Sequence, residues 1–289
     1  MTNIAYVNGR YVPLQEAQVS IEDRGYQFAD GVYEVIAFYN RRLLDEKLHM
    51  QRLTRSLKEL RIAAPMSDAA FRLVIRELIE RNNREHGTLY VQITRGTARR
   101  DHTFPKHARP NLVMAVTGPK MPKAKDVDKG ISVITLPDIR WERRDIKSIS
   151  LLPNILAKQS AMEAGAKEAW LYDGKGVINE GSSSNNAIVT AKGEIMTSPT
   201  SNLILGGITR AVLLDIARKN GFKVVEKSFS VKQAKEAKEA FMLSTTSNVL
   251  PVTSIDGVKV GNGKPGATTL KLLALYHEHI YRETGYQWQ

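Results

Sequence analysis

The sequence predicts an α+β protein of two domains. Strand-like and helix-like segments are mixed in both halves of the chain, without the regular alternation that builds a Rossmann sheet. The 289 residues are 42% hydrophobic, which is enough to fill real cores. Residues 118–130 are rich in Gly, Pro, Lys and Asp and nearly free of large apolar side chains, as an exposed connection would be. We therefore expect a small domain over residues 1–118, an interdomain connection over 119–130 and a larger domain over 131–289.

Two hairpins are expected at the start of the small domain. Asn8-Gly9, between the strand-like segments Ile4–Val7 and Arg10–Val12, is the pair that a type I′ turn prefers. A second strand, Val32–Tyr39, reaches a turn at Asn40-Arg41.

Two helices and two further strands follow in the small domain. Apolar residues at helical spacing predict helices over His49–Leu60 and Ser67–Asn82, the second with Ser67 and Asp68 as candidate capping residues. Strands are expected over Thr88–Thr94 and Asn111–Thr117, in the same sheet as the hairpins.

The larger domain is also expected to mix strands and helices. Its elements, in chain order, are a strand over Ile131–Leu136, a helix opened by Pro153, a strand over Glu168–Tyr172, a hairpin turning at Lys192-Gly193, a helix over Thr209–Lys219, a strand over Glu239–Leu243 and a helix from Thr268.

Composition excludes several classes of protein. The chain has no cysteine, so it can form no disulfide, no thiolate metal site and no thiol nucleophile. Its N-terminal residues lack the basic and apolar regions of a signal peptide, and no apolar run approaches the roughly 20 residues that span a bilayer. We expect a soluble cytoplasmic protein with no membrane partner.

The net charge of +12 raises the question of a nucleic-acid partner. The basic pairs Arg41-Arg42, Arg99-Arg100 and Arg143-Arg144 lie in different segments, without the interleaved aromatic residues of single-strand binders. An ordinary solvated surface with a few anion-binding positions is the favoured interpretation, and no nucleic-acid partner is expected.

Motifs for metal and nucleotide chemistry are missing. His277-Glu278-His279 puts its two rings on different faces of the expected helix, so two exposed histidines are predicted there and no metal site. The sequence has no Gly-x-Ser-x-Gly elbow, Walker loop or Rossmann fingerprint, which disfavours hydrolase and nucleotide-dependent classes.

Three polar loops of the larger domain could hold an anion. Gly206-Gly207 leads into the helix at Ile208-Thr209, where free backbone N–H groups and the helix dipole favour a phosphate. Gly181–Asn185 and Ser244–Ser247 are hydroxyl-rich turns at strand ends, able to bind an anion or the substituents of a cofactor ring. Taken alone, the glycine loop is better explained as an ordinary capped helix, and the hydroxyl-rich turns as plain turns. Three such loops together with one lysine in an apolar segment favour a phosphorylated cofactor held near an amine.

Lys147 is the candidate nucleophile. It stands between an arginine-rich stretch and an apolar run, and burial or the nearby Arg140, Arg143 and Arg144 could lower its pKa enough to form a Schiff base. The alternative is a surface lysine in a charged segment, just as Glu180 could be an ordinary exposed carboxylate at a strand end.

With these segments in order, the chain resembles the fold-type IV pyridoxal-phosphate enzymes, and most closely the D-amino acid aminotransferases. The resemblance covers nearly the whole chain. It implies a small α/β domain and a larger, β-barrel-like α+β domain. The motifs that carry it are Asp23–Glu34, His49–Leu53, Thr94–Thr97, Asp145–Ser148, Glu180–Asn185, Gly207–Arg210 and Ser244–Ser247.

The resemblance implies pyridoxal 5′-phosphate as the cofactor and assigns residues to it. Lys147 would carry the Schiff base and move the proton between the substrate Cα and the cofactor C4′. Glu180 would face the pyridine nitrogen, and Leu205 would pack against one face of the ring. The phosphate would be bound by Arg52, by the amides of Ile208 and Thr209 and by Thr245, with Thr246 nearby.

The resemblance also implies a substrate class. Arg100 and His102 match an Arg-x-His pair that the partner subunit of a homodimer supplies, and with Tyr33 they would bind the substrate α-carboxylate. Leu152 stands where branched-chain members usually have a tyrosine, five residues after the lysine. We expect D-alanine and D-glutamate as amino donors, with pyruvate or 2-oxoglutarate as acceptors.

Three alternatives stay open. Within the same fold, the protein could be a branched-chain L-amino acid aminotransferase or an aminodeoxychorismate lyase. Outside enzymes, it could be a basic nucleic-acid-binding or scaffold protein on an inactive fold, which the intact cofactor positions disfavour.

Overall fold

The computed structural model describes residues 3–119 and 124–288 and divides into two compact units. The first unit consists of Met1–Lys120, Ile146–Ser150 and Arg282–Tyr286, and the second consists of the remaining residues. Residues 120–123 of the predicted connection lie outside the described residues. The part of it that is described includes a short helix, α4 (Ala124–Asp128), where only irregular chain was expected.

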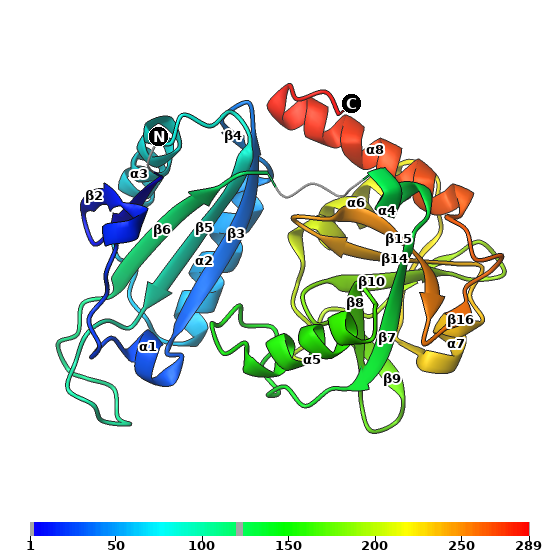
Figure 1. The fold of residues 1–289 in the computed structure, drawn as a ribbon, viewed down its shortest axis with the longest axis horizontal. Coiled ribbons are helices and arrows are strands. Elements are labelled where there is room, and N and C mark those ends of the chain that lie inside the picture. The colour runs from blue at the N-terminus through cyan, green and yellow to red at the C-terminus, as the bar shows by residue number, and fades with distance from the viewer. Residues whose placement is uncertain (1–2, 120–123, 289) are drawn as a thin grey trace. The chain divides into compact units, whose positions relative to one another are not determined.

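A six-stranded antiparallel sheet forms the first unit (Figure 1). At its two hairpin turns, Asn8 and Gly9 have φ of 48° and 94°, and Asn40 and Arg41 have φ of 49° and 60°. These left-handed values are those of type I′ turns, so both hairpin predictions are confirmed. The spatial order is β2-β1-β6-β5-β3-β4, with β1 (Ile4–Val7), β2 (Arg10–Pro13), β3 (Gly31–Tyr39), β4 (Arg42–Leu43), β5 (Gly87–Thr94) and β6 (Asn111–Thr117).

Both predicted helices of the first unit are present, as α2 (Glu46–Glu59) and α3 (Asp68–Arg81). Ser67 caps α3, because its hydroxyl accepts a hydrogen bond from the N–H of Ala70. The short helix α1 (Arg24–Phe28) and the 3-10 turn η1 (Leu14–Glu16) were not expected from the sequence.

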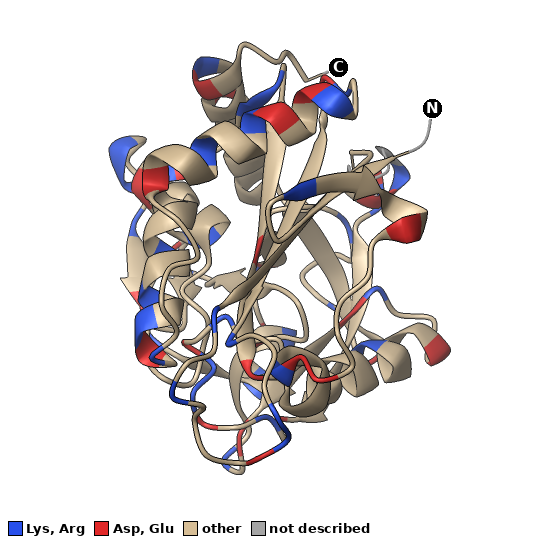
Figure 2. Ribbon diagram, turned by 90° about the vertical axis from the view of Figure 1, so that its left-hand side faces the viewer, with Lys and Arg blue, Asp and Glu red and all other residues tan. Residues whose placement is uncertain are grey.

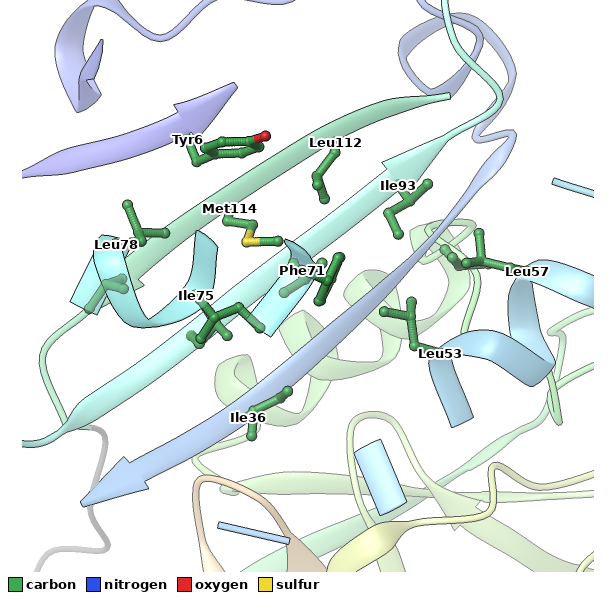
Figure 3. Close-up of a cluster of buried hydrophobic side chains, with 14 of the residues drawn as sticks. Tyr6, Ile36, Leu53, Leu57, Phe71, Ile75, Leu78, Ile93, Leu112 and Met114 are labelled. Atoms are coloured by element: carbon green, nitrogen blue, oxygen red, sulfur yellow. The ribbon is translucent and has the colours of Figure 1, made fainter. Parts of the chain in front are cut away.

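The core of the first unit lies between its helices and one face of the sheet. Figure 3 shows Leu53 of α2 and Phe71 of α3 among strand side chains such as Ile36 and Met114. Strand residues alternate between the two faces of a sheet, so Tyr33, next to a buried position of β3, lies on the face away from these helices.

The second unit is built on a ten-stranded sheet that curls on itself (Figure 1). Its buried interior contains Trp170, Ile188, Met242 and Leu250. The path is β12-β11-β10-β14-β15-β7-β8-β9-β13, with β16 beside β15; the strands are β7 (Ile131–Pro137), β8 (Glu168–Tyr172), β9 (Val177–Gly181), β10 (Asn185–Val189), β11 (Ile195–Thr197), β12 (Val224–Glu226), β13 (Phe229–Ser230), β14 (Glu239–Ser244), β15 (Asn248–Ile255) and β16 (Val258–Lys259).

The helices of the second part of the chain are α5 (Leu152–Glu163), α6 (Ile208–Lys219), α7 (Val231–Lys235) and α8 (Ala267–Thr284). All the elements predicted for residues 131–289 are present within one or two residues of their expected bounds; α7 was not predicted. None of the helices in the described part of the chain is both long and apolar enough to cross a membrane.

One prediction in α8 is wrong. His277 and His279 were expected to be exposed, but both are partly buried. The His277 ring stacks on Trp288 with ring centroids 4.2 Å apart, and burial lowers the pKa of His277 to about 4. His277 is therefore neutral near pH 7, and its surroundings are those of a packed side chain.

Charged residues of both signs are interspersed along the ribbon (Figure 2). Many basic side chains have acidic neighbours, as Arg81 has Glu77 and Lys219 has Asp215. This mixing agrees with the solvated surface expected from the scattered basic pairs.

Candidate active site

Lys147 is anchored in the first unit through its backbone. The side chain of the preceding residue, Ile146, is buried in the core, and Ser148 forms a bridge with Val32 of β3. The Tyr33 N–H donates to the Lys147 carbonyl at 3.0 Å, and the Lys147 Nζ lies 4.1 Å from the centroid of the Tyr33 ring. These contacts hold the amine beside the face of the sheet that the helices leave open.

Arg52 of α2 is held by a buried carboxylate. Its Nε and Nη2 donate to the two oxygens of Glu34 at 2.7 and 2.8 Å. His49 Nδ1 lies 2.9 Å from Glu34 Oε2, and because a carboxylate can only accept, this nitrogen carries the proton. One helical turn after Arg52, the Ser56 hydroxyl accepts a hydrogen bond from the Lys147 N–H at 3.3 Å. The same face of α2 therefore carries Arg52 and contacts the Lys147 backbone.

Glu34 makes the stability of the folded protein depend on pH in the acid range. Burial alone would raise its pKa, but the charge and hydrogen bonds of Arg52 and His49 lower the pKa of Glu34 to about 2. Because the pKa of Glu34 is lower in the folded state than its unfolded-state value of 4.5, its ionised form stabilises the fold at pH values above 4.5. That stabilisation is lost as the pH falls toward 2.

We therefore expect the free energy of unfolding of Glu34→Gln to depend less on pH below about pH 5 than that of the wild type. The shift corresponds to roughly 3 kcal/mol of unfolding free energy between about pH 5 and pH 2. Urea unfolding at a series of pH values measures it, with Glu80→Gln, an exposed carboxylate of α3, as the control. An unchanged pH slope in Glu34→Gln would contradict the role assigned to this carboxylate.

Glu180 of β9 is the centre of a buried polar network in the second unit. Only 4% of it is exposed, so the alternative of an exposed strand-end carboxylate is wrong. Arg140 Nη1 donates to its Oε1 at 2.6 Å, while the Asn185 amide and the Leu205 N–H each donate to its Oε2 at 3.0 Å. Burial raises the pKa of Glu180, and the Arg140 guanidinium and the Leu205 amide offset part of that rise.

The three arginines near Lys147 in sequence are paired with carboxylates. Arg140 forms a two-pronged contact with Asp138, and Arg144 approaches the same carboxylate at 3.5 Å. Arg143 pairs with Asp145 at 3.0 Å. The charges of these arginines are therefore compensated within the second unit.

The hydroxyl-rich turn after Glu180 does not present its side chains as expected. The hydroxyls of Ser182, Ser183 and Ser184 all donate to Glu168, which is completely buried. This turn is therefore occupied by an internal carboxylate, which was not predicted because Glu168 lies on another strand. Through these hydrogen bonds, Glu168 fixes the chain between Glu180 and Asn185.

The start of α6 has the features of an anion site. Gly207 is its capping residue, no side chain caps the helix, and its first turn contains no acidic residue. The amides of Ile208 and Thr209 are thus available at the positive end of the helix. A Cβ on Gly207 would come within 1.9 Å of Asn185 Oδ1, so any larger residue would have to displace the Asn185 side chain.

The candidate residues of the second unit lie around Asn185, at the start of β10. Asn185 contacts both Glu180 and the carbonyl of Leu205, and it lies opposite Leu243 of β14. Thr245 and Thr246 form the turn that follows two residues later, and both are partly exposed. Asn185 thus connects the Glu180 position, the α6 start and the hydroxyl turn, and it was not among the predicted site residues.

Arg100 and His102 lie in a loop of the first unit and share one neighbour, the Phe28 ring. Tyr33 instead contacts Tyr90, with ring centroids 5.9 Å apart. Among residues 3–119 and 124–288, no hydrogen bond, ion pair or ring contact joins Tyr33 to Arg100 or His102. Within one chain the structure thus brings together Lys147 with Tyr33, and Arg100 with His102, as two separate pairs.

The chain is similar to known proteins over nearly its whole length. A family model described as amino-transferase class IV matches residues 31–255. The chain is 43% identical to a D-alanine aminotransferase of Bacillus licheniformis over 96% of this chain and 97% of that protein. It is 41% identical to a D-alanine aminotransferase of Listeria innocua over 96% of each.

Solved structures share the fold. A branched-chain amino acid aminotransferase of Escherichia coli superposes with a TM-score of 0.90 at 24% identity, covering 100% of this chain and 97% of the other. A second branched-chain amino acid aminotransferase, from T.th. and complexed with N-(5′-phosphopyridoxyl)-L-glutamate, superposes with a TM-score of 0.88 at 27% identity, covering 98% and 95%.

These similarities confirm the predicted fold-type IV architecture and enzyme class. Class IV aminotransferases depend on pyridoxal 5′-phosphate, so the predicted cofactor is confirmed with the family. By its sequence and by its fold, this chain belongs to the class IV amino-transferase family of pyridoxal-phosphate-dependent transaminases.

Proposed function

We propose that this protein is a D-amino acid:2-oxoacid aminotransferase that uses D-alanine and D-glutamate as donors and pyruvate and 2-oxoglutarate as acceptors. The observation that carries the proposal is the full-length similarity to D-alanine aminotransferases, at 38–43% identity. The Arg100 and His102 pair beside Phe28 supports it, because a guanidinium and an imidazole on one loop suit a carboxylate.

The residues present fit pyridoxal 5′-phosphate. The uncapped α6 amides, the glycine at 207, Thr245 and Thr246 suit a phosphate. Arg52, whose guanidinium is held by Glu34, is proposed to bind the same phosphate. The Leu205 backbone lies beside Glu180, and its side chain is proposed to pack on one face of the ring. The buried Glu180 carboxylate suits a protonated ring nitrogen.

The cofactor, when bound, supplies an electron sink that allows the substrate Cα–H bond to be broken reversibly. Lys147 is proposed to attach the cofactor and then to move a proton between the substrate Cα and the cofactor C4′. Glu180 holds the proton at the ring nitrogen. Tyr33, Arg100 and His102 bind the substrate α-carboxylate, with the Arg100 loop supplied by the partner in a homodimer.

A homodimer in the cytoplasm is part of the same proposal, and the absence of cysteine suits a reducing compartment. Sedimentation of the purified enzyme tests the dimer: a monomer that is fully active at all concentrations would contradict a shared site.

We expect Gly207→Ala to weaken cofactor binding by about 10-fold, because the added methyl group must displace the Asn185 amide from the start of α6. Gly206→Ala is the matched control, since a Cβ there meets nothing within 4 Å. Titration of the apoenzyme with pyridoxal phosphate, followed by absorbance, measures both. Equal affinities of the two variants for pyridoxal phosphate would contradict the proposed role of this turn in binding the phosphate.

A half-reaction screen tests the proposed function. The holoenzyme is mixed with D-alanine, D-glutamate, L-leucine or L-glutamate, and loss of the cofactor band is followed without an acceptor. We expect rapid loss with the D-amino acids only. Because the solved relatives named above are branched-chain enzymes, faster reaction with L-leucine would favour that alternative. Pyruvate release from aminodeoxychorismate would favour the lyase.

A further inference from the structure

The Phe28 ring is the common neighbour of the two substrate-binding candidates. Phe28 ends helix α1. The guanidinium carbon of Arg100 lies 4.9 Å from its ring centroid, and the His102 ring centroid lies 5.5 Å away at a tilt of 50°. Both distances are within the range of direct ring contact. Arg100 and His102 are otherwise exposed, so this ring gives both side chains a shared surface to pack on.

Arg24, on the same helix, holds the backbone between these two residues. It is 3% exposed, and its Nη1 donates to the Asp101 carbonyl at 2.6 Å. Its guanidinium carbon also lies 4.9 Å from the Phe28 ring centroid. A charged donor on the peptide between Arg100 and His102 restricts the direction in which both side chains leave the chain.

Asp30 connects this contact to a second one further along the loop. It accepts from Arg24 Nε at 2.8 Å and from Arg95 Nε and Nη2 at 2.7 and 2.9 Å. The Arg95 guanidinium carbon lies 3.6 Å from the ring centroid of Phe104, two residues after His102. The loop is therefore held within the Arg-x-His pair, at Asp101, and again just after it, at Phe104.

Holding a loop in this way has a functional consequence. Residues 98–110 form no helix or strand, and long side chains on an irregular loop lose rotamer entropy when they bind a ligand. Contacts that order them beforehand reduce that loss.

We propose that Phe28 and Arg24 are positioning residues that hold Arg100 and His102 as a preformed pair for the substrate α-carboxylate. This inference rests on the proposed function. Neither residue has to touch the substrate. Phe28 acts through its ring face and Arg24 through the Asp101 carbonyl, so the effect falls on substrate binding and not on proton transfer.

The test is the half-reaction of the holoenzyme with D-alanine, from which an apparent Kd and a limiting rate are obtained. Phe28→Leu is expected to raise the apparent Kd roughly 10-fold and to change the limiting rate less than about 3-fold. Phe28→Tyr, which keeps the ring, should restore wild-type binding. Tyr26→Leu is the matched control, because Tyr26 is an aromatic residue of the same helix that is 75% exposed.

Two further arms separate positioning from a general structural effect. D-alaninamide lacks the carboxylate, so its apparent Kd should be the same for Phe28→Leu and wild type. In an Arg100→Met background, Phe28→Leu should add little, because residues acting through one another are not additive. Should Phe28→Leu fail to fold, Arg24→Lys replaces it, with the same expected rise.

The outcomes distinguish the two levels of inference. A wild-type enzyme that does not react with D-alanine would refute the proposed function. A wild-type enzyme that reacts, with a Phe28→Leu or Arg24→Lys variant whose apparent Kd stays within about twofold, would overturn the positioning role. Equal losses with D-alanine and D-alaninamide would overturn it as well.

Discussion

Replacement of Lys147 by alanine is expected to lower transaminase turnover by about 10⁴-fold or more, because one amine provides both the covalent attachment of the cofactor and the proton transfer. Stability should change little. The position of the backbone depends on the burial of Ile146, the bridge between Ser148 and Val32 and the hydrogen bond from the Tyr33 N–H, none of which uses the lysine side chain.

Three measurements check this expectation. Steady-state rates with D-alanine and 2-oxoglutarate report turnover, and thermal unfolding reports stability. Borohydride reduction followed by peptide mass analysis should locate the cofactor on Lys147 in the wild type and on no residue in the variant. Lys219→Ala, which removes an exposed lysine paired with Asp215, should behave as the wild type. Full turnover by Lys147→Ala would eliminate the proposed mechanism.

The second largest effect is expected at Glu180. Glu180→Gln should lower kcat by roughly 10²- to 10³-fold, in line with the loss of one preorganised electrostatic contact. The variant keeps the size of the side chain and a group that can contact Asn185. Arg140 keeps its two-pronged contact with Asp138, so its guanidinium still has a carboxylate partner and the fold should survive.

Glu194→Gln provides the control, because Glu194 belongs to the same unit and is paired with Lys223. Its kcat should match the wild type. The KM for D-alanine should change less than kcat in Glu180→Gln, since the carboxylate is assigned to the ring nitrogen and not to the substrate. A Glu180→Gln variant with wild-type kcat would require another group at the ring nitrogen.

The candidate site divides into positions that local sequence could predict and positions that it could not. Asn8-Gly9 and the start of α6 at Gly207 were predictable, because left-handed turns and helix starts depend on a few adjacent residues. Glu34 was not, because its contact with Arg52 requires α2 to pack on β3, and nothing in the spacing of the two residues indicates that contact.

Glu168 and Asn185 illustrate the same limit in the second unit. The serines after Glu180 suggested an anion, and the anion they bind is Glu168, an internal carboxylate from β8. The sequence predicts Asn185 only as part of a polar turn, whereas its side-chain amide donates to both Glu180 and the Leu205 carbonyl. Hydroxyl and amide groups satisfy whichever partner packing brings to them, and the sequence does not name that partner.

By itself, the sequence predicted most of the strands and helices, the two-domain α+β class and, through its ordered motifs, the family, with Lys147 as the proposed nucleophile. Tertiary structure alone decided which polar groups are paired: Glu34 with Arg52, Glu180 with Arg140, and Arg24 with the Asp101 carbonyl. The physical reason is range. Turns, caps and hydrophobic periodicity depend on neighbouring residues, whereas burial and ion pairing depend on segments that meet only after the chain has packed.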